Sequence, residues 1–218
     1  DMDAAQTEVS EATRTATFTP GRDAARKEAS KLNVPRIGVR FRLPASMNQV
    51  EYFGRGPAEN YLDRNAGSMI GLYKSTAEEL YFPYVRPQEN GHHTDTRWVS
   101  LSTGKKGLLI QADNTIGFNA LRNSIEDFDD EEATGLSRQW SNFTPEQVAN
   151  HDEAAAKNVL RRQHHINDIT PCDFVEVCVD LKQQGVAGYD SWGSRPEPAY
   201  TLPANREYNW GFTLIPLK

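Results

Sequence analysis

The 218-residue sequence has no long hydrophobic run and fewer basic than acidic residues. Its apolar stretches are a few residues long, far short of the roughly 20 that a helix needs to cross a bilayer, so no membrane partner is expected. Against 30 Asp and Glu there are 24 Lys and Arg, and the formal net charge is −6. Because nucleic-acid affinity comes largely from clustered Lys and Arg, nucleic acid is not an expected partner either.

The sequence also lacks the usual motifs of phosphate, zinc and nucleophile sites. Gly54-Arg55-Gly56-Pro57 has neither the spacing nor the following helix of a phosphate-binding loop, and is interpreted as a turn. His92-His93 and His164-His165 place adjacent imidazoles on opposite sides of an extended chain, so no metal site is predicted. No Gly-x-Ser-x-Gly elbow is present. Serine nucleophile chemistry therefore has no support.

Only two cysteines occur, Cys172 and Cys178. They are predicted to lie in one strand, where six residues at about 3.3 Å each separate them by roughly 20 Å. A disulfide between them would break that strand. We therefore expect two free, buried thiols, which carry little information about the redox compartment.

The hydrophobic pattern is typical of an all-β domain. In residues 36–43 the apolar side chains alternate with Arg and Gly, which predicts a strand with one buried face. Further strands are predicted at residues 13–19, 50–53, 98–101, 108–112, 174–181 and 208–214. One segment differs: Thr144-Pro145-Glu146-Gln147 is typical of a helix start and predicts a helix at residues 144–162, after the acidic run at 126–132. All 218 residues are expected to form a single domain.

Several motifs follow one another in a recognisable order. They are VPRIGVRF at 34–41, VEYFGRGPAENYLDR at 50–64, YVRPQENG at 84–91, TDTRW at 94–98, GYDSWG at 188–193 and PAYTLP at 198–203. In this order and spacing they closely resemble the C-terminal small-chain domain (domain 5) of LacZ-type β-galactosidases, members of glycoside hydrolase family 2. The resemblance covers roughly residues 15–217 and departs from the usual pattern between 126 and 170.

The resemblance implies a β-supersandwich similar to galactose mutarotase, here with one inserted helix. It also implies a domain cut from a larger enzyme that removes terminal non-reducing β-D-galactose from β-galactosides. The partner in the same full-length chain is a TIM barrel that holds both catalytic glutamates, so this chain contains no catalytic residue and the isolated domain is expected to be inactive. No cofactor is expected in this domain, since the relatives bind divalent and monovalent cations through other domains. A homo-oligomeric full-length enzyme and either a cytoplasmic or a periplasmic location remain open.

Trp192 is the residue that the resemblance assigns to the sugar or aglycone, together with Asp190 and Ser191. An indole offers a flat apolar face to the C–H side of a pyranose, and the flanking Gly188 and Gly193 are typical of an exposed loop. A buried core tryptophan is the alternative. Further polar residues could bind a ligand or hold their own loop in place: Glu89, Asn90, Asp95 and Arg97. Another group is interpreted as turn and salt-bridge structure: Glu59, Asn60, Asp63 and Arg64.

Two other functions stay open because the fold alone does not decide function. The chain could be an autonomous carbohydrate-binding module. It could also be an aldose epimerase, which needs a general acid and base across one sugar ring, for example His92 with Glu89. The 30 acidic residues do not by themselves indicate glycosidase catalysis, because the distance between two catalytic carboxyl groups is spatial and not sequential.

Overall fold

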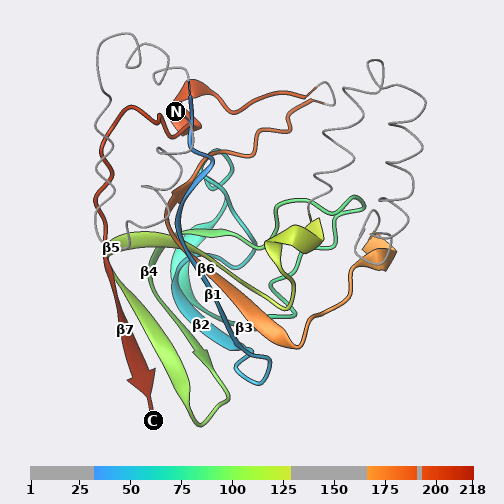
Figure 1. Cartoon of the computed structure of the whole chain (residues 1–218), viewed down its shortest axis with the longest axis vertical. Coiled ribbons are helices and arrows are strands. Elements are labelled where there is room, and N and C mark those ends of the chain that lie inside the picture. Colours follow the sequence, from blue (N-terminus) through green and yellow to red (C-terminus); the bar gives the residue numbers. More distant parts are fainter. Residues whose placement is uncertain (1–31, 129–165, 191–192) are drawn as a thin grey trace, which may run out of the picture.

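The computed structural model describes residues 32–128, 166–190 and 193–218, and there the chain forms one antiparallel β-sheet (Figure 1). Its strands are β1 (Arg36–Pro44), β2 (Gln49–Gly56), β3 (Met69–Thr76), β4 (His93–Ser102), β5 (Gly107–Leu121), β6 (Phe174–Gln183) and β7 (Phe212–Leu217). The order is β1-β6-β5-β4-β2-β3, and β7 pairs with β5. The described helices are short 3-10 turns: η1 (Ile125–Phe128), η4 (Ile166–Asp168) and η5 (Pro198–Tyr200). The predicted all-β class is confirmed, and the sheet is consistent with a β-sandwich.

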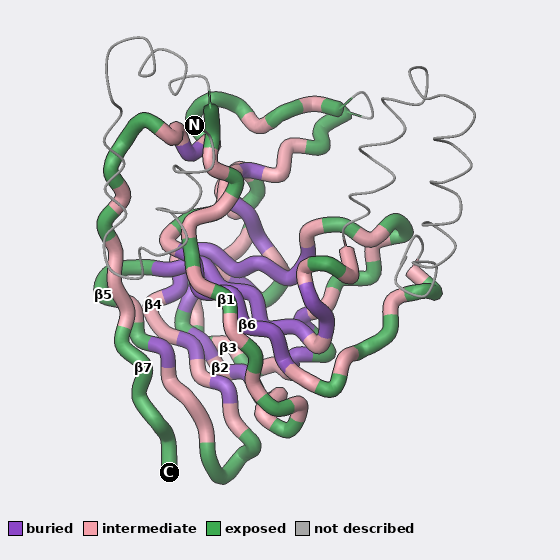
Figure 2. Tube along the Cα trace, viewed as in Figure 1, coloured by how far each residue is buried: buried purple, intermediate pink, exposed green. Residues whose placement is uncertain are grey.

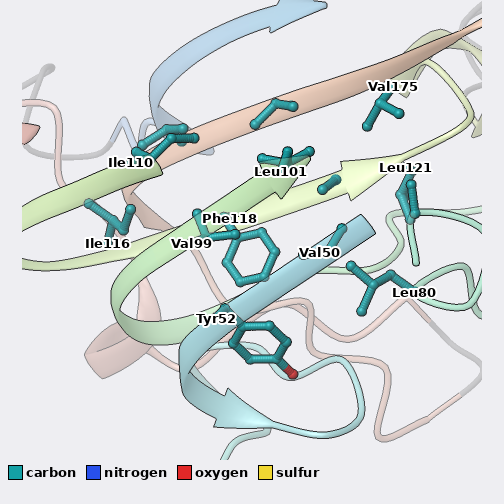
Figure 3. Packing of buried hydrophobic residues seen from close by; sticks show 14 residues of the cluster. Val50, Tyr52, Leu80, Val99, Leu101, Ile110, Ile116, Phe118, Leu121 and Val175 are labelled. Atoms are coloured by element: carbon teal, nitrogen blue, oxygen red, sulfur yellow. The ribbon is translucent and has the colours of Figure 1, made fainter. Parts of the chain in front are cut away.

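One face of the sheet carries the apolar core. Phe118 in β5 lies opposite Val179 in β6, and Val179 lies opposite Val39 in β1, so these side chains share a face. The buried residues of the sheet include the second half of β5 and much of β4 and β6, in the central part of the molecule in Figure 2. Figure 3 shows Phe118 and Tyr52 among the aliphatic side chains. The ring centroids of these two aromatics lie 5.0 Å apart in an edge-to-face arrangement. Burial of this face is the main stabilising contribution to the sheet.

The predicted alternation in residues 36–43 holds from Val39 onward. Val39, Phe41 and Leu43 pack against the core, while the intervening Arg40 and Arg42 are exposed. The pairing of β1 with β6 shifts by one residue between positions 37 and 38. This bulge ends the simple alternation at the start of the strand.

Several predicted boundaries differ from the structure. β3 was not predicted, β5 continues nine residues beyond position 112, and β7 begins at Phe212 instead of 208. The strand predicted at 13–19 and the helix predicted at 144–162 lie outside the described residues. No helix in the described ranges is long and apolar enough to cross a membrane.

The prediction of a turn at Gly54-Arg55-Gly56-Pro57 is wrong, because β2 extends through Gly56. These glycines serve close packing instead of chain reversal. A Cβ on Gly54 would lie 2.5 Å from Thr96 Oγ1, and one on Gly56 would collide with the Tyr52 hydroxyl. Only glycine allows the neighbouring strand and ring to approach this closely.

The two cysteines are free, as predicted, but only one lies in the strand. Cys178 is in β6 and is buried, and burial raises the pKa of its thiol to about 12. Cys172 precedes β6 and is only half-buried. The prediction that both thiols are buried in one strand is therefore wrong for Cys172, whose segment lies before the start of the strand.

Candidate functional site

The loop that follows β6 leads directly to the predicted sugar-contact residues. Ser191 and Trp192 lie outside the described residues, whereas Asp190 is described and exposed. Asp190 Oδ1 accepts a hydrogen bond from Ser194 N at 3.3 Å, and Gly188 N donates to Ser194 Oγ at 3.2 Å. The two ends of the loop are therefore tied to each other on either side of positions 191 and 192.

Asp63 holds the base of this loop, the 185–190 segment. Its Oδ1 accepts a hydrogen bond from Val186 N at 3.1 Å, and its Oδ2 accepts one from Ala187 N at 2.7 Å. Gly185 N donates to the carbonyl oxygen of Tyr200 at 2.8 Å. A carboxylate that accepts backbone N–H groups forms charge-assisted bonds, which are stronger than neutral ones. The loop base is thus bonded on two sides.

Glu59 organises the segment from which Asp63 projects, the 59–68 turn. Its carboxylate accepts hydrogen bonds from Arg64 Nη2 at 2.7 Å, Gly91 N at 2.7 Å and the Tyr61 hydroxyl at 3.2 Å, and also from the Tyr84 hydroxyl. The Glu59 side chain is only 5% exposed. Burial raises the pKa of the Tyr61 hydroxyl, and the Glu59 carboxylate raises it further. The predicted salt-bridge structure is present here. Its four hydrogen bonds occupy the acceptor sites of the Glu59 carboxylate, so none is left for a ligand.

A surface hollow of about 370 Å³ lies beside this turn. Its volume falls in the range of sites that hold small molecules. The Tyr200 side chain forms one wall and is 37% exposed. The remaining lining comes from the turn itself: Glu59, Leu62, Asp63, Arg64, Asn65, Ala66, Gly67 and Ser68.

The other polar residues singled out in the sequence contact protein groups. The Asn90 side chain accepts a hydrogen bond from Phe82 N at 2.8 Å and donates one to the Phe82 carbonyl oxygen. Arg97 donates to the carbonyl oxygen of Asp95 and lies 5.8 Å from the ring centroid of Phe53. Asn90 thus holds its own loop in place, whereas Asp95 and Arg97 lie in β4 and not in a loop as predicted. None of these contacts joins Asn90 or Arg97 to the 185–190 loop.

A second group of polar side chains, the buried polar cluster, lies on the sheet face opposite the core. It consists of Arg36, Glu89, His92, Asn119 and Asp180. Arg36 Nε donates to Asp180 Oδ2 at 2.9 Å, and its guanidinium also bonds Asn119 Oδ1. His92 Nδ1 lies 2.8 Å from Asn119 Oδ1, so this nitrogen carries the proton. Glu89 accepts from Asn119 Nδ2 at 3.2 Å.

Burial determines the electrostatics of this cluster. Burial lowers the pKa of His92 to about 3, and the Arg36 guanidinium lowers it further. Burial raises the pKa of Asp180 to about 7 against the opposing effect of Arg36. His92 and Asp180 are 2% and 1% exposed. The adjoining cavity has only about 20 Å³, room for one water molecule.

His92 and His93 point to opposite sides of the chain, as the sequence predicts. The His92 ring stacks on Tyr61 at 5.7 Å, while the His93 ring stacks on Phe118 at 5.0 Å. In the part of the chain that the structure describes, no three His, Cys, Asp or Glu side chains are grouped so as to hold a metal ion.

Comparison with known proteins places this sheet in a family. A family profile described as Beta galactosidase small chain matches residues 3–214. The chain belongs to the β-galactosidase small-chain family. This small chain is 35% identical to a β-galactosidase of Priestia megaterium over 185 residues, which cover 84% of the chain and 15% of that protein. It is 29% identical to one of Vibrio cholerae over 181 residues, covering 83% of the chain and 14% of that protein.

The small chain therefore spans about 15% of the length of the curated relatives that it matches. A further relative, a β-galactosidase of an Arthrobacter species, is 41% identical over 99 residues, which cover 43% of this chain and 10% of that protein. The resemblance noted in the motifs is confirmed.

Sequence reasoning missed the link between Asp63 and the 185–190 loop. The turn was predicted, but the partner of its carboxylate lies 123 residues further along the chain. The available signal was local: an Asp in a polar turn commonly accepts hydrogen bonds from backbone N–H groups. Nothing in the sequence indicated which backbone segment that would be.

Proposed function

We propose that this chain completes the sugar and aglycone site of a β-galactosidase and supplies no catalytic carboxyl group. The main support is the sequence match, which covers 84% of this chain and 15% of a β-galactosidase. A segment of that share leaves most of the enzyme to other domains. The partners proposed here are a TIM barrel with both glutamates and a substrate with terminal β-D-galactose. Any divalent or monovalent cations belong to those other domains.

The acids beside the surface hollow support a non-catalytic role. A glycosidase needs two carboxyl groups that face the glycosidic bond. Glu59 is nearly buried and is bonded to Arg64, and both oxygens of Asp63 accept backbone N–H groups. Neither is available to donate a proton to a substrate or to attack it. The isolated chain is therefore proposed to be inactive towards galactosides.

Trp192 is the proposed contact with the substrate, assisted by Asp190 and Ser191. The described residues on either side of it support this: Gly188 and Gly193 have φ values of 81°, and Asp190 is exposed. Such a loop lies at the surface, where a neighbouring domain can reach it.

The test is Trp192→Ala in the enzyme assembled with its catalytic barrel, with Trp192→Phe as the control. Loss of an aromatic contact of about 0.5–1.5 kcal/mol raises KM about two- to tenfold, whereas Phe retains most of the apolar face. Initial rates with lactose and a nitrophenyl galactoside measure the change. Unchanged KM and kcat in Trp192→Ala contradict the proposal.

An autonomous carbohydrate-binding module is the second candidate, and the surface hollow with its Tyr200 wall is the observation that favours it. One wall of a composite site supplies only part of the contacts, so we expect weak or undetectable binding of free sugar. Calorimetry of the 218-residue chain with galactose and lactose separates the two candidates, because micromolar affinity favours the module. The epimerase alternative is not favoured, since His92 is sealed from solvent.

A further inference from the structure

We infer that Asp63 is a positioning residue for sugar binding: it sets the backbone path of the 185–190 loop, the described segment that precedes Trp192 in the sequence. This inference rests on the proposed function, because the contact of Trp192 with sugar belongs to that proposal. What it adds is a second residue, in a different strand connection, on which sugar affinity depends. Asp63 itself is not proposed to touch the sugar.

Asp63 is presented by a turn that is closed and anchored. Tyr61 N donates to the Arg64 carbonyl oxygen at 3.2 Å, and Arg64 N donates to the Tyr61 carbonyl oxygen at 2.8 Å. These reciprocal bonds place Asp63 inside a four-residue turn. Tyr61 is 1% exposed, and its ring stacks on that of His92. The carboxylate of Asp63 therefore projects from a rigid support.

The loop that Asp63 holds follows an unfavourable backbone path. Ala187 has φ 53° and Gly188 has φ 81°, so two consecutive residues are left-handed. Alanine rarely adopts this conformation, because its Cβ approaches the carbonyl oxygen. A residue persists there only when the surrounding structure over-determines it. The bond from Ala187 N to Asp63 Oδ2, at 2.7 Å, acts at this residue.

Gly185 shows how closely the loop sits on the carboxylate. A Cβ at this position would lie 2.5 Å from Asp63 Cγ and would also collide with its Oδ2. Any side chain at position 185 would push the loop away from Asp63. On its other side, Gly185 N donates to the Tyr200 carbonyl oxygen. The loop is thus fitted between Asp63 and Tyr200 just before its two left-handed residues.

The first experiment measures the loop directly in the 218-residue chain. In Asp63→Ala we expect the Val186 and Ala187 amides to exchange with deuterium at least tenfold faster, while the amides of β5 keep their protection. Asp173→Ala is the control, since Asp173 is an exposed aspartate at the opposite end of β6. Unchanged exchange at Val186 and Ala187 overturns the inference.

The second experiment is a double-mutant cycle in the assembled enzyme. If Asp63 acts through the position of Trp192, Asp63→Ala raises KM about two- to tenfold with little change in kcat. The double variant Asp63→Ala/Trp192→Ala is then no worse than Trp192→Ala alone, because the shared contact is lost only once. Additive effects overturn the positioning role. Gly185→Ala tests the same contact from the loop side and should reproduce the rise in KM.

The conservative variant Asp63→Asn keeps the inference testable if Asp63→Ala does not fold. It retains one acceptor oxygen for the two N–H groups, so we expect intermediate values for amide exchange and for KM. A raised KM in Trp192→Ala with an unchanged KM in Asp63→Asn and Gly185→Ala overturns the positioning role alone. An unchanged KM in Trp192→Ala overturns the proposed function, and the role of Asp63 in sugar binding with it.

Discussion

The buried polar cluster and the 59–68 turn both gather charged side chains, but the turn is much more open to solvent. In the cluster, Asp180 is 1% exposed and the adjoining cavity holds about 20 Å³. In the turn, the Arg64 side chain is 53% exposed and borders a hollow of about 370 Å³. The cluster braces β1, β5 and β6 against one another, whereas the turn supports a surface loop.

In this chain, the residues with strongly shifted pKa values are not the residues linked to the candidate sugar loop. Strongly shifted pKa values are a common marker of active sites. In this chain the shifts of His92 and Asp180 arise from burial, at a place that no sugar can enter. The residue linked to the candidate sugar loop, Asp63, is recognised by its backbone bonds instead. In this chain, solvent access and contact with a left-handed backbone segment indicate the candidate site better than shifted pKa values do.

The largest expected effect concerns the buried pair. In Arg36→Met, the Asp180 carboxyl loses its guanidinium partner inside the sheet. Breaking a buried pair by removing one member costs about 3–5 kcal/mol. Because burial already raises the pKa of Asp180 to about 7, the orphaned carboxyl can take up a proton, and we expect a loss nearer the lower end, about 3 kcal/mol. Urea unfolding at pH 7 measures it.

Lys74→Met is the matched control for an exposed pair on the same sheet. Lys74 Nζ lies 3.3 Å from Glu51 Oε2, and the two side chains are 74% and 36% exposed. Such a pair contributes about 0–1 kcal/mol. Equal losses of unfolding free energy in Arg36→Met and Lys74→Met would show that the buried and the exposed ion pair contribute alike.

A second effect, which appears only on acidification, is expected from His92. Its folded pKa of about 3 lies below the ordinary value of 6.5, so the unfolded chain binds a proton that the folded chain refuses. The stabilising contribution is complete above pH 6.5 and is lost as the pH falls towards 3, by up to about 1.4 kcal/mol per pH unit. Asp180, whose pKa is raised from 3.8 to about 7, contributes in the opposite direction between those two values.

His92→Asn isolates the histidine part of this dependence. Its amide can still donate to Asn119 Oδ1, but it does not titrate. We expect the unfolding free energy of this variant to fall less steeply than that of the parent chain as the pH is lowered from about 6.5 to about 4, whatever its value at neutral pH. Parallel pH profiles of the variant and the parent chain in urea unfolding would show that folding does not lower the pKa of His92.

The sequence predicted the strands whose two faces differ most. In β1 and β6, every second residue is apolar over most of the strand, and Arg, Glu and Asp stand among the residues between, so both strands were predicted within about two residues. β3 was missed because it lies at the sheet edge, where Met69 and Leu72 are exposed and no alternation appears. The second half of β5 was missed because the polar stretch at 113–115 interrupts its apolar pattern.

The candidate site was less predictable than the fold. Trp192, Asp190 and Ser191 came from a resemblance of motifs, and their chemistry could be stated without a structure. Asp63 could not be linked to Val186, because a contact across 123 residues depends on which strand connections the folded sheet brings together. The same limit applies to Arg36 and Asp180, which meet only when β1 pairs with β6.

The smallest effect on stability is expected at the wall of the open hollow. In Tyr200→Ala the ring, already 37% exposed, is removed, but the backbone carbonyl that bonds Gly185 N remains. Surface substitutions of this kind change the unfolding free energy by about 0.5 kcal/mol or less. Urea unfolding should place Tyr200→Ala close to the parent chain and far from Arg36→Met. A loss of several kcal/mol would mean that the hollow is part of the structural core, and the contrast with the buried polar cluster would disappear.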